Sequence, residues 1–272
     1  MIVLLLLVVS LGAGEVEVPP ASLDYGYRLM YNLDFARAQK EFTRWQEEHQ
    51  DDPLGPVSEA AGWLFAELNR LEALEAQFFI KDSSFAARRK LSPDPAIRTR
   101  LDAALQRAED RARRRLESNP KDLDALFAMT LSAGLKADYA ALIEKRNLAA
   151  LRYTRQGSYW ADKLLALDPG YYDAYLAMGI GRYIVGSQPA PLRWLLRLGG
   201  FSGDKRKGIQ ELELTAQRGR FLAPFARILL AIAYLREKDK TRARQLLTGL
   251  RDEFPGNPLF ARELGRLDPS PR

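Results

Sequence analysis

The sequence contains no cysteine and a single histidine among its 272 residues. Without cysteine the chain forms no disulfide, binds no metal or iron–sulfur cluster through thiolates, and has no thiol nucleophile. The lone His49 lies in the polar run 46–52, which is typical of a solvated helix end. One histidine is too few for a histidine-rich metal site and makes a histidine-based triad improbable. We therefore expect no metal, no cofactor and no enzymatic activity.

Common motifs for nucleotide binding and hydrolysis are also missing. The chain has no P-loop, no G-x-S-x-G, no H-E-x-x-H and no EF-hand loop. The glycines of 179–186 lack the G-x-G-x-x-G spacing and follow a helical pattern, so close helix packing explains them better than a dinucleotide loop. A deep polar pocket that joined Asp173, Tyr183 and Lys205 would be needed to favour an enzyme.

Runs of Val, Ile and Thr are scarce, whereas Leu and Ala supply most of a hydrophobic content of 47%. This composition favours helix over strand nearly everywhere, so we expect an all-α fold. No Gly/Ser-rich linker divides the chain, which favours one continuous core over two domains. In the middle of the chain the pattern predicts helices at 121–134, 138–152 and 154–167.

The N-terminus is apolar over residues 2–9 and then has small residues at 10 and 12–14, followed by acidic residues. This pattern is typical of a signal peptide, although no Lys or Arg precedes the apolar run. The run is shorter than the roughly 20 residues that a membrane-spanning helix needs. We expect 1–14 to be a signal peptide that directs the chain to the periplasm or the extracellular space. An N-terminal membrane anchor is the alternative.

The C-terminal region has a regular spacing of small and large residues. Ala231 and Tyr234 lie three apart on one helix, Ala243 and Leu247 lie four apart on the next, and Pro255 ends the pair. Small residues let two antiparallel helices approach closely, large ones fill the space between hairpins, and proline stops the second helix. In this pattern the segment resembles the tetratricopeptide repeat.

Weaker copies of the pattern occur at 26–42 and 175–179, and the helix-ending prolines do not follow the family's period of about 34 residues. The chain therefore resembles exported bacterial tetratricopeptide-repeat proteins with degenerate repeats. The resemblance implies a right-handed solenoid of antiparallel helix hairpins over residues 15–267, with a disordered tail at 268–272. It also implies, by association, a protein-binding scaffold.

The same resemblance implies that the first helix of each hairpin lines a concave face. The side chains expected there are Tyr27 and Tyr31 in the first repeat, Ile180, Tyr183 and Ile184 in the middle one, and Ile232 and Arg236 in the last. A groove rich in tyrosine suits an extended peptide or a partner helix.

Residues 187–207 interrupt a repeat between its two helices. The segment has a proline-rich entry, a short leucine-rich helix and a glycine-rich exit, and it is similar to an insertion in exported bacterial tetratricopeptide proteins. One interpretation is that its leucines cover the neighbouring hairpins. The other is that Arg193, Trp194 and Arg197 bind a partner, since Trp and Arg are enriched at interface hot spots.

Residues 81–115 have an excess of basic over acidic side chains that equals the net charge of the whole chain, +6. One interpretation is a solvated helix face with ion pairs such as Asp110 with Arg114. The other is contact with an anionic membrane surface.

Together these observations predict a non-catalytic protein–protein interaction scaffold of the cell envelope. The alternative is a module that binds a membrane surface or an anionic ligand, and we expect no nucleic-acid partner.

Overall fold

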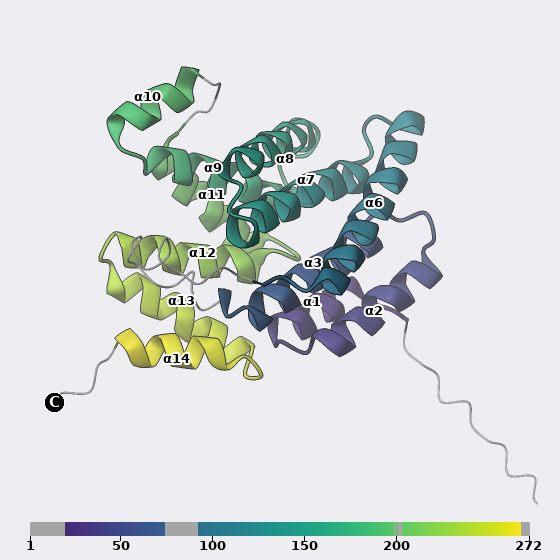
Figure 1. The fold of residues 1–272 in the computed structure, drawn as a ribbon, viewed down its shortest axis with the longest axis horizontal. Helices are drawn as coiled ribbons and strands as arrows, with labels where there is room; N and C mark the ends of the chain where they lie inside the picture. The colour runs from purple at the N-terminus through teal and green to yellow at the C-terminus, as the bar shows by residue number, and fades with distance from the viewer. Residues whose placement is uncertain (1–19, 74–91, 199, 201–202, 268–272) are drawn as a thin grey trace, which may run out of the picture.

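The computed structural model describes residues 20–73, 92–198, 200 and 203–267, and every regular element within them is a helix (Figure 1). The all-α prediction is confirmed. The α-helices are α1 (Leu23–Tyr31), α2 (Phe35–Glu48), α3 (Leu54–Arg70), α6 (Pro95–Ser118), α7 (Leu123–Asp138), α8 (Asn147–Leu167), α9 (Tyr175–Gly186), α10 (Ala190–Leu198), α11 (Lys205–Arg218), α12 (Ala223–Arg236), α13 (Lys240–Glu253) and α14 (Pro258–Leu267). A π-helix η1 (Tyr139–Ile143) and a 3₁₀-helix η2 (Tyr172–Ala174) complete the order.

Three sequence predictions fall on residues outside this description. They are the signal peptide at 1–14, the disordered tail at 268–272, and the part of the basic segment between 81 and 91.

Helix starts follow from short polar side chains. The carboxylates of Asp34, Asp122 and Asp239 each accept a hydrogen bond from the backbone N–H three residues later, at the starts of α2, α7 and α13. Such N-caps satisfy a donor that the first helical turn leaves without an intrahelical partner. The local sequence therefore sets where these helices begin.

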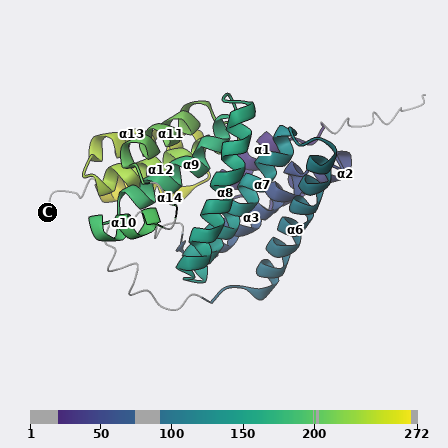
Figure 2. The same cartoon turned by 90° about the horizontal axis from the view of Figure 1, so that it is seen from above.

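Helices that are consecutive in the chain pack against each other (Figures 1 and 2). Ala231 and Ala243, which the sequence predicted to be close-packing positions, are fully buried where α12 meets α13. Leu247 is fully buried as well, and Tyr234 is buried with its hydroxyl donating to Glu213. The expected burial of these four positions is confirmed.

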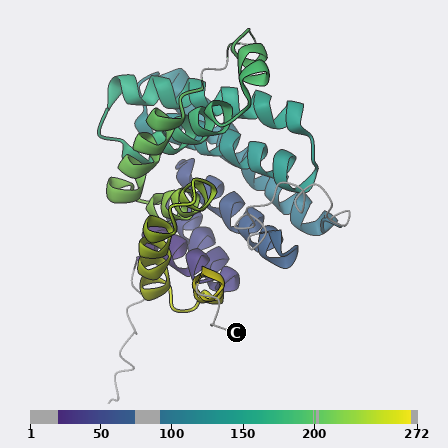
Figure 3. The same cartoon turned by 90° about the vertical axis from the view of Figure 1, so that its left-hand side faces the viewer.

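The two ends of the described chain meet, as Figure 3 shows for the purple N-terminal and yellow C-terminal helices. Asn257 Nδ2 donates to the Tyr31 carbonyl oxygen at 2.9 Å, and the Gly256 N–H donates to Asn32 Oδ1 at 2.9 Å. Arg220, just before α12, forms an ion pair with Asp24 of α1 at 2.7 Å. The first helix is therefore covered by the last third of the chain.

This closure fills the inside of the molecule with aromatic rings. The Tyr27 ring stacks on Phe221 with centroids 5.0 Å apart, and the Tyr31 ring lies 5.5 Å from that of Phe254. Both tyrosines are only 3% exposed. The prediction that Tyr27 and Tyr31 face an open groove is wrong, because aromatic rings from the segments just before α12 and just after α13 occupy the space in front of them.

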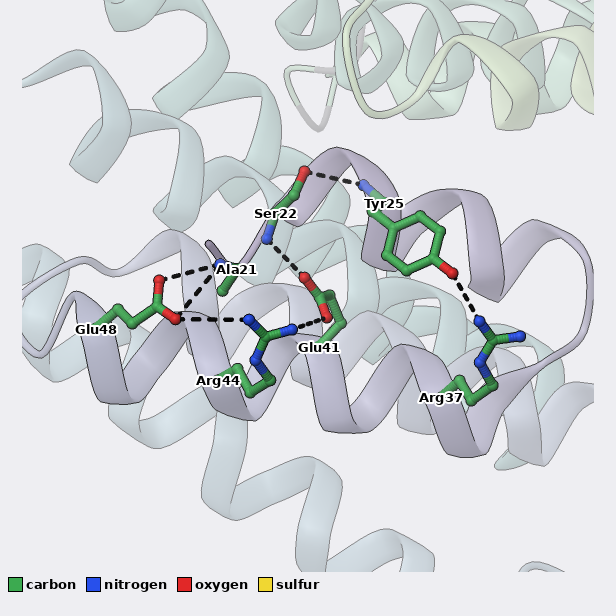
Figure 4. A network of polar contacts seen from close by, with 7 residues as sticks. All are labelled: Ala21, Ser22, Tyr25, Arg37, Glu41, Arg44 and Glu48. Carbon is green, nitrogen blue, oxygen red and sulfur yellow. Dashed lines mark hydrogen bonds and ion pairs between the residues drawn. The ribbon is translucent and has the colours of Figure 1, made fainter. Parts of the chain in front are cut away.

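Carboxylates of α2 hold the start of α1 (Figure 4). The Ser22 N–H donates to Glu41 at 2.7 Å, and the Ala21 N–H donates to Glu48 at 3.1 Å. Arg44 lies between the two carboxylates and pairs with Glu41 at 3.1 Å. These contacts fix the start of α1 against α2, and both Glu41 and Glu48 have partners.

The helix boundaries predicted in the middle of the chain are wrong. Instead of ending at Gly134, α7 runs to Asp138 and continues as the π-helix 139–143, in which the Glu144 N–H donates to the Tyr139 carbonyl. Helix α8 then runs unbroken from Asn147 to Leu167. Gly134 has no neighbouring atom that a side chain would meet, and tertiary burial of the surrounding apolar residues keeps the helix intact there.

Within the described residues, the stretch Leu123–Ile143 is the one helix long and apolar enough to cross a membrane. Most of this stretch is buried among other helices of the molecule. A core helix of this kind passes the same test of length and composition, so the finding is weak evidence for a membrane span.

Candidate functional site

A groove of about 720 Å³ lies between α8, α9 and α10. Its α8 wall contains Leu151, Thr154, Arg155, Ser158, Tyr159 and Asp162; its α9 wall contains Met178, Ile180, Gly181, Ile184 and Val185; Leu192 and Leu196 line it from α10. We call this space the α8–α10 groove. It is mostly apolar, with a small number of polar groups, which is the composition typical of binding sites.

Helix α10 forms one wall of the groove and projects from the other helices at the top left of Figure 1. Leu192 and Leu196 lie four residues apart and share the helix face that lines the groove. Trp194 lies between them in sequence and is 63% exposed. The helix therefore presents leucine to the groove and leaves tryptophan in contact with solvent.

The base of this wall is fixed by a glycine-mediated crossing of α9 and α11. A Cβ atom on Gly208 would lie 2.6 Å from the Tyr183 backbone nitrogen, and one on Gly186 would lie 2.5 Å from that of Lys205. A Cβ on Gly179 would lie 2.9 Å from the Gly208 carbonyl oxygen. Close helix packing is confirmed as the role of these glycines, and the helices that flank the 187–207 insertion are held tightly together.

Asp138 lies at the inner end of the groove, where α7 passes into the π-helix. It lines both the groove and a neighbouring cavity of about 80 Å³. Among the described residues its carboxylate has no hydrogen bond or ion pair, and burial raises its pKa to about 7. Segments of π-helix are rare and occur frequently at functional sites. A carboxyl group in this position can accept a proton or pair with a cation.

The sequence did not identify Asp138. Because a new helix was predicted to begin at 138, an aspartate there had the ordinary explanation of an N-cap. The absence of glycine and proline between Leu135 and Ala140 was the signal that could have predicted a continuous helix, with Asp138 inside it.

The insertion residues predicted to bind a partner are exposed to different extents. Trp194 and Arg197 are exposed, whereas Arg193 is partly buried and donates to the Gly186 carbonyl oxygen at 3.4 Å. Arg193 thus contacts the end of α9. Its contact contributes to the position of α10.

The residues expected on the concave face in the middle and last repeats also differ in their exposure and surroundings. Ile180 and Ile184 line the α8–α10 groove, and Ile184 is 47% exposed. Arg236 is exposed at the end of α12. The prediction that Tyr183 faces a groove is wrong, since this residue is only 7% exposed.

Two of the three residues named for an enzyme, Asp173 and Lys205, have structural partners. Asp173 accepts hydrogen bonds from the backbone N–H groups of Arg220, Phe221 and Leu222, and its pKa is raised by burial. Lys205 pairs with Glu237 at 2.5 Å. These contacts explain Asp173 and Lys205 as parts of the packing between helices.

The described arginines of the basic segment 81–115 pair largely with carboxylates. Arg98 pairs with Asp102 and Glu144, Arg107 with Glu59, and Arg115 with Asp122. Asp110 pairs with Arg113 at 3.0 Å, whereas the sequence predicted a pair with Arg114, the next residue. This pattern supports the interpretation as a solvated helix face, because paired arginines offer little net charge to an anionic surface.

In the parts of the chain that the structure describes, no cluster of three or more His, Asp or Glu side chains could hold a metal ion. Neither the family models nor the curated proteins with which the chain was compared gave a match.

Proposed function

We propose that this chain is a non-catalytic interaction module that binds an apolar segment of a partner protein in the α8–α10 groove. The observation that carries the proposal is the groove itself, about 720 Å³ in volume, with Leu192 and Leu196 of α10 opposite Ile180 and Ile184 of α9. Apolar side chains on facing helices favour an apolar occupant such as a helix or an extended segment.

The proposal includes a tetratricopeptide-like helical solenoid. Antiparallel neighbours that pack in chain order, and the buried Ala231 and Ala243 of the last hairpin, support this architecture. The contacts of Asn257 and Gly256 with α1 make it a closed form of such a solenoid, in which the inner face is filled. We therefore propose that the partner binds in the α8–α10 groove, whereas in longer repeat arrays it binds on an open concave face.

We also propose that the chain acts outside the cytoplasm, on the basis of the apolar run and small residues within 1–14. Its partner is then another protein of the cell envelope. The alternative, binding to a membrane surface, is less well supported, because Arg98, Arg107 and Arg115 of the basic segment pair with carboxylates.

Photo-crosslinking tests the groove as the binding site. A benzophenone amino acid is placed at Ile184 or Leu192, which line the groove and are 47% and 43% exposed, and the full chain is expressed in its native cells. We expect both positions to crosslink the same segment of one protein. Leu167, which is 41% exposed at the end of α8, is the matched control and should not.

The identity of the adducts distinguishes the alternatives. Adducts with lipid alone at Ile184 and Leu192 would favour the membrane-surface function. Absence of adducts, or the same adducts from Leu167, would contradict the proposal.

A further inference from the structure

Asp138 is the one carboxyl group that lines both the groove and the inner cavity without a partner among the described residues. Two other carboxylates in these spaces differ from it. Asp173 is satisfied by backbone N–H groups, and Asp162 is exposed on α8. A partly buried carboxylate without a partner is costly, so its site favours a ligand that supplies one.

The charged groups around Asp138 do not neutralise it. On the groove side these are Arg155 and Arg182, and Arg182 forms an ion pair with Glu211 of α11. Arg155 is exposed, with its guanidinium beside Gly200 at the opposite wall. On the cavity side the titratable groups are Tyr27 and Tyr31 of α1 and Asp173 beside α9. Burial alone accounts for the raised pKa of Asp138, and no charged neighbour shifts it.

The walls next to Asp138 are apolar or already hydrogen-bonded. Thr154 lines both spaces, and its hydroxyl donates to the Ala150 carbonyl at 2.9 Å. Ile180 also lines both spaces, and Ala137 and Leu151 are further apolar neighbours in the groove. The site therefore combines one acid with an apolar approach, which matches an alkyl chain that ends in a cation.

We propose that Asp138 binds the primary ammonium group of an alkylamine whose hydrocarbon chain lies in the α8–α10 groove. As the occupant of the groove we name a lysine side chain of the partner segment, so this inference rests on the proposed function. A free small amine has the same chemistry and is distinguished by the experiment. The carboxylate pairs with the ammonium group in a partly buried site, where such a contact is stronger than at the surface.

Calorimetric titration of the full chain with octylamine, octanol and octanoate tests the head group at constant chain length. At about pH 8 we expect octylamine to bind on the order of tenfold more tightly than octanol, and octanoate to bind most weakly. Asp138→Asn should abolish this preference and leave octanol binding unchanged. Asp252→Asn, which removes an exposed acid of α13 that does not line the groove, should retain it.

A proton linkage provides a second readout. Because ammonium binding requires the ionised carboxylate, the affinity for octylamine should rise between about pH 6 and about pH 8. At the lower pH, binding should release a proton from Asp138, so the measured heat should depend on the ionisation enthalpy of the buffer. In Asp138→Asn both effects should vanish. An equal preference for octylamine in wild type and Asp138→Asn, or the absence of octylamine binding, would overturn the inference.

Two acetylated leucine-rich peptides, one with a central lysine and one with norleucine in its place, distinguish the source of the amine. Tighter binding of the lysine peptide that depends on Asp138 supports a protein segment, whereas binding of octylamine alone supports a free amine and overturns the named occupant. Crosslinks from Leu192 without amine binding would leave the proposed function intact and refute this inference. Amine binding that depends on Asp138 without protein crosslinks would contradict the proposed function and the lysine occupant, and would support a site for a free amine.

Discussion

At the scale of single residues, Asp138 shows how burial without a partner sets a chemical property. Its carboxyl group lies between a groove and a cavity, and burial raises its pKa from the ordinary 3.8 to about 7. The folded state therefore binds more protons than the unfolded state between about pH 4 and about pH 7. Through this group, stability falls as the pH rises across that window.

We predict that Asp138→Asn stabilises the protein at high pH and not at low pH. At about pH 8 the substitution removes a buried charge, and the free energy of unfolding should rise by on the order of 1 to 3 kcal/mol. Near pH 4 the wild-type group is neutral and the difference should disappear. Urea unfolding of both proteins at the two pH values measures this. Asp162→Asn is the control, and an equal effect of Asp138→Asn at both pH values would contradict the prediction.

At the scale of helices, glycine has opposite consequences on the two sides of α9. Gly179 and Gly186 face α11, where a Cβ would meet backbone atoms at 3.0 Å or less. Gly181 faces α8, where the nearest atom to an added Cβ is Thr154 Cγ2 at 3.5 Å. The first pair is needed for helix packing, while Gly181 leaves room in the groove.

We predict opposite signs for alanine substitutions at these two kinds of position. Gly208→Ala should lower the free energy of unfolding by about 1 to 3 kcal/mol, because its Cβ would lie 2.6 Å from the Tyr183 nitrogen and the helices must separate. Gly181→Ala should be neutral or raise it by up to about 1 kcal/mol, since alanine favours the helix. Thermal unfolding followed by circular dichroism measures both, and destabilisation by Gly181→Ala of the same size would refute the distinction.

At the scale of helices, the sequence indicates a boundary reliably only where neighbouring residues determine it. Asp122 and Asp239 act as N-caps at the starts of α7 and α13, as their chemistry favours. The boundary expected at Gly134 does not exist, because burial of the neighbouring apolar residues outweighs the low helix propensity of a single glycine. That difference is also why the sequence missed Asp138.

At the scale of the whole molecule, contacts between the first helix and the last two close the structure. Asn257 is 6% exposed; its amide donates to the Tyr31 carbonyl, and its Oδ1 accepts from the Leu259 N–H at the start of α14. One side chain therefore joins α1 to α14. A change there should affect both ends of the chain.

We predict that Asn257→Ala lowers the free energy of unfolding by about 1 to 3 kcal/mol, because it leaves buried backbone groups without partners. Hydrogen exchange measured by mass spectrometry should become faster in α1 as well as in α14. Asp239→Ala, which removes an exposed cap of α13, is the control and should cost about 1 kcal/mol with faster exchange in α13 only. Unchanged exchange in α1 of the Asn257→Ala protein would contradict the closure.

The sequence by itself determined the properties that depend on neighbouring residues in the chain. Helical content follows from composition, several helix starts follow from aspartate caps, and the packing at Ala231 and Ala243 follows from residue size at helical spacing. The same holds for Gly179 and Gly186 of α9, since a small residue is what a close helix crossing requires.

Only the tertiary structure decided which surfaces are open. Tyr27 and Tyr31 are buried because Phe221 and Phe254 pack on them, and no local pattern encodes contacts over nearly two hundred residues or more. The groove likewise exists because α8, α9 and α10 each contribute residues to one space, and Asp138 has its unusual environment because a helix continues where a break was expected. Burial depends on all of the packed elements together, and local sequence determines only what each element can offer.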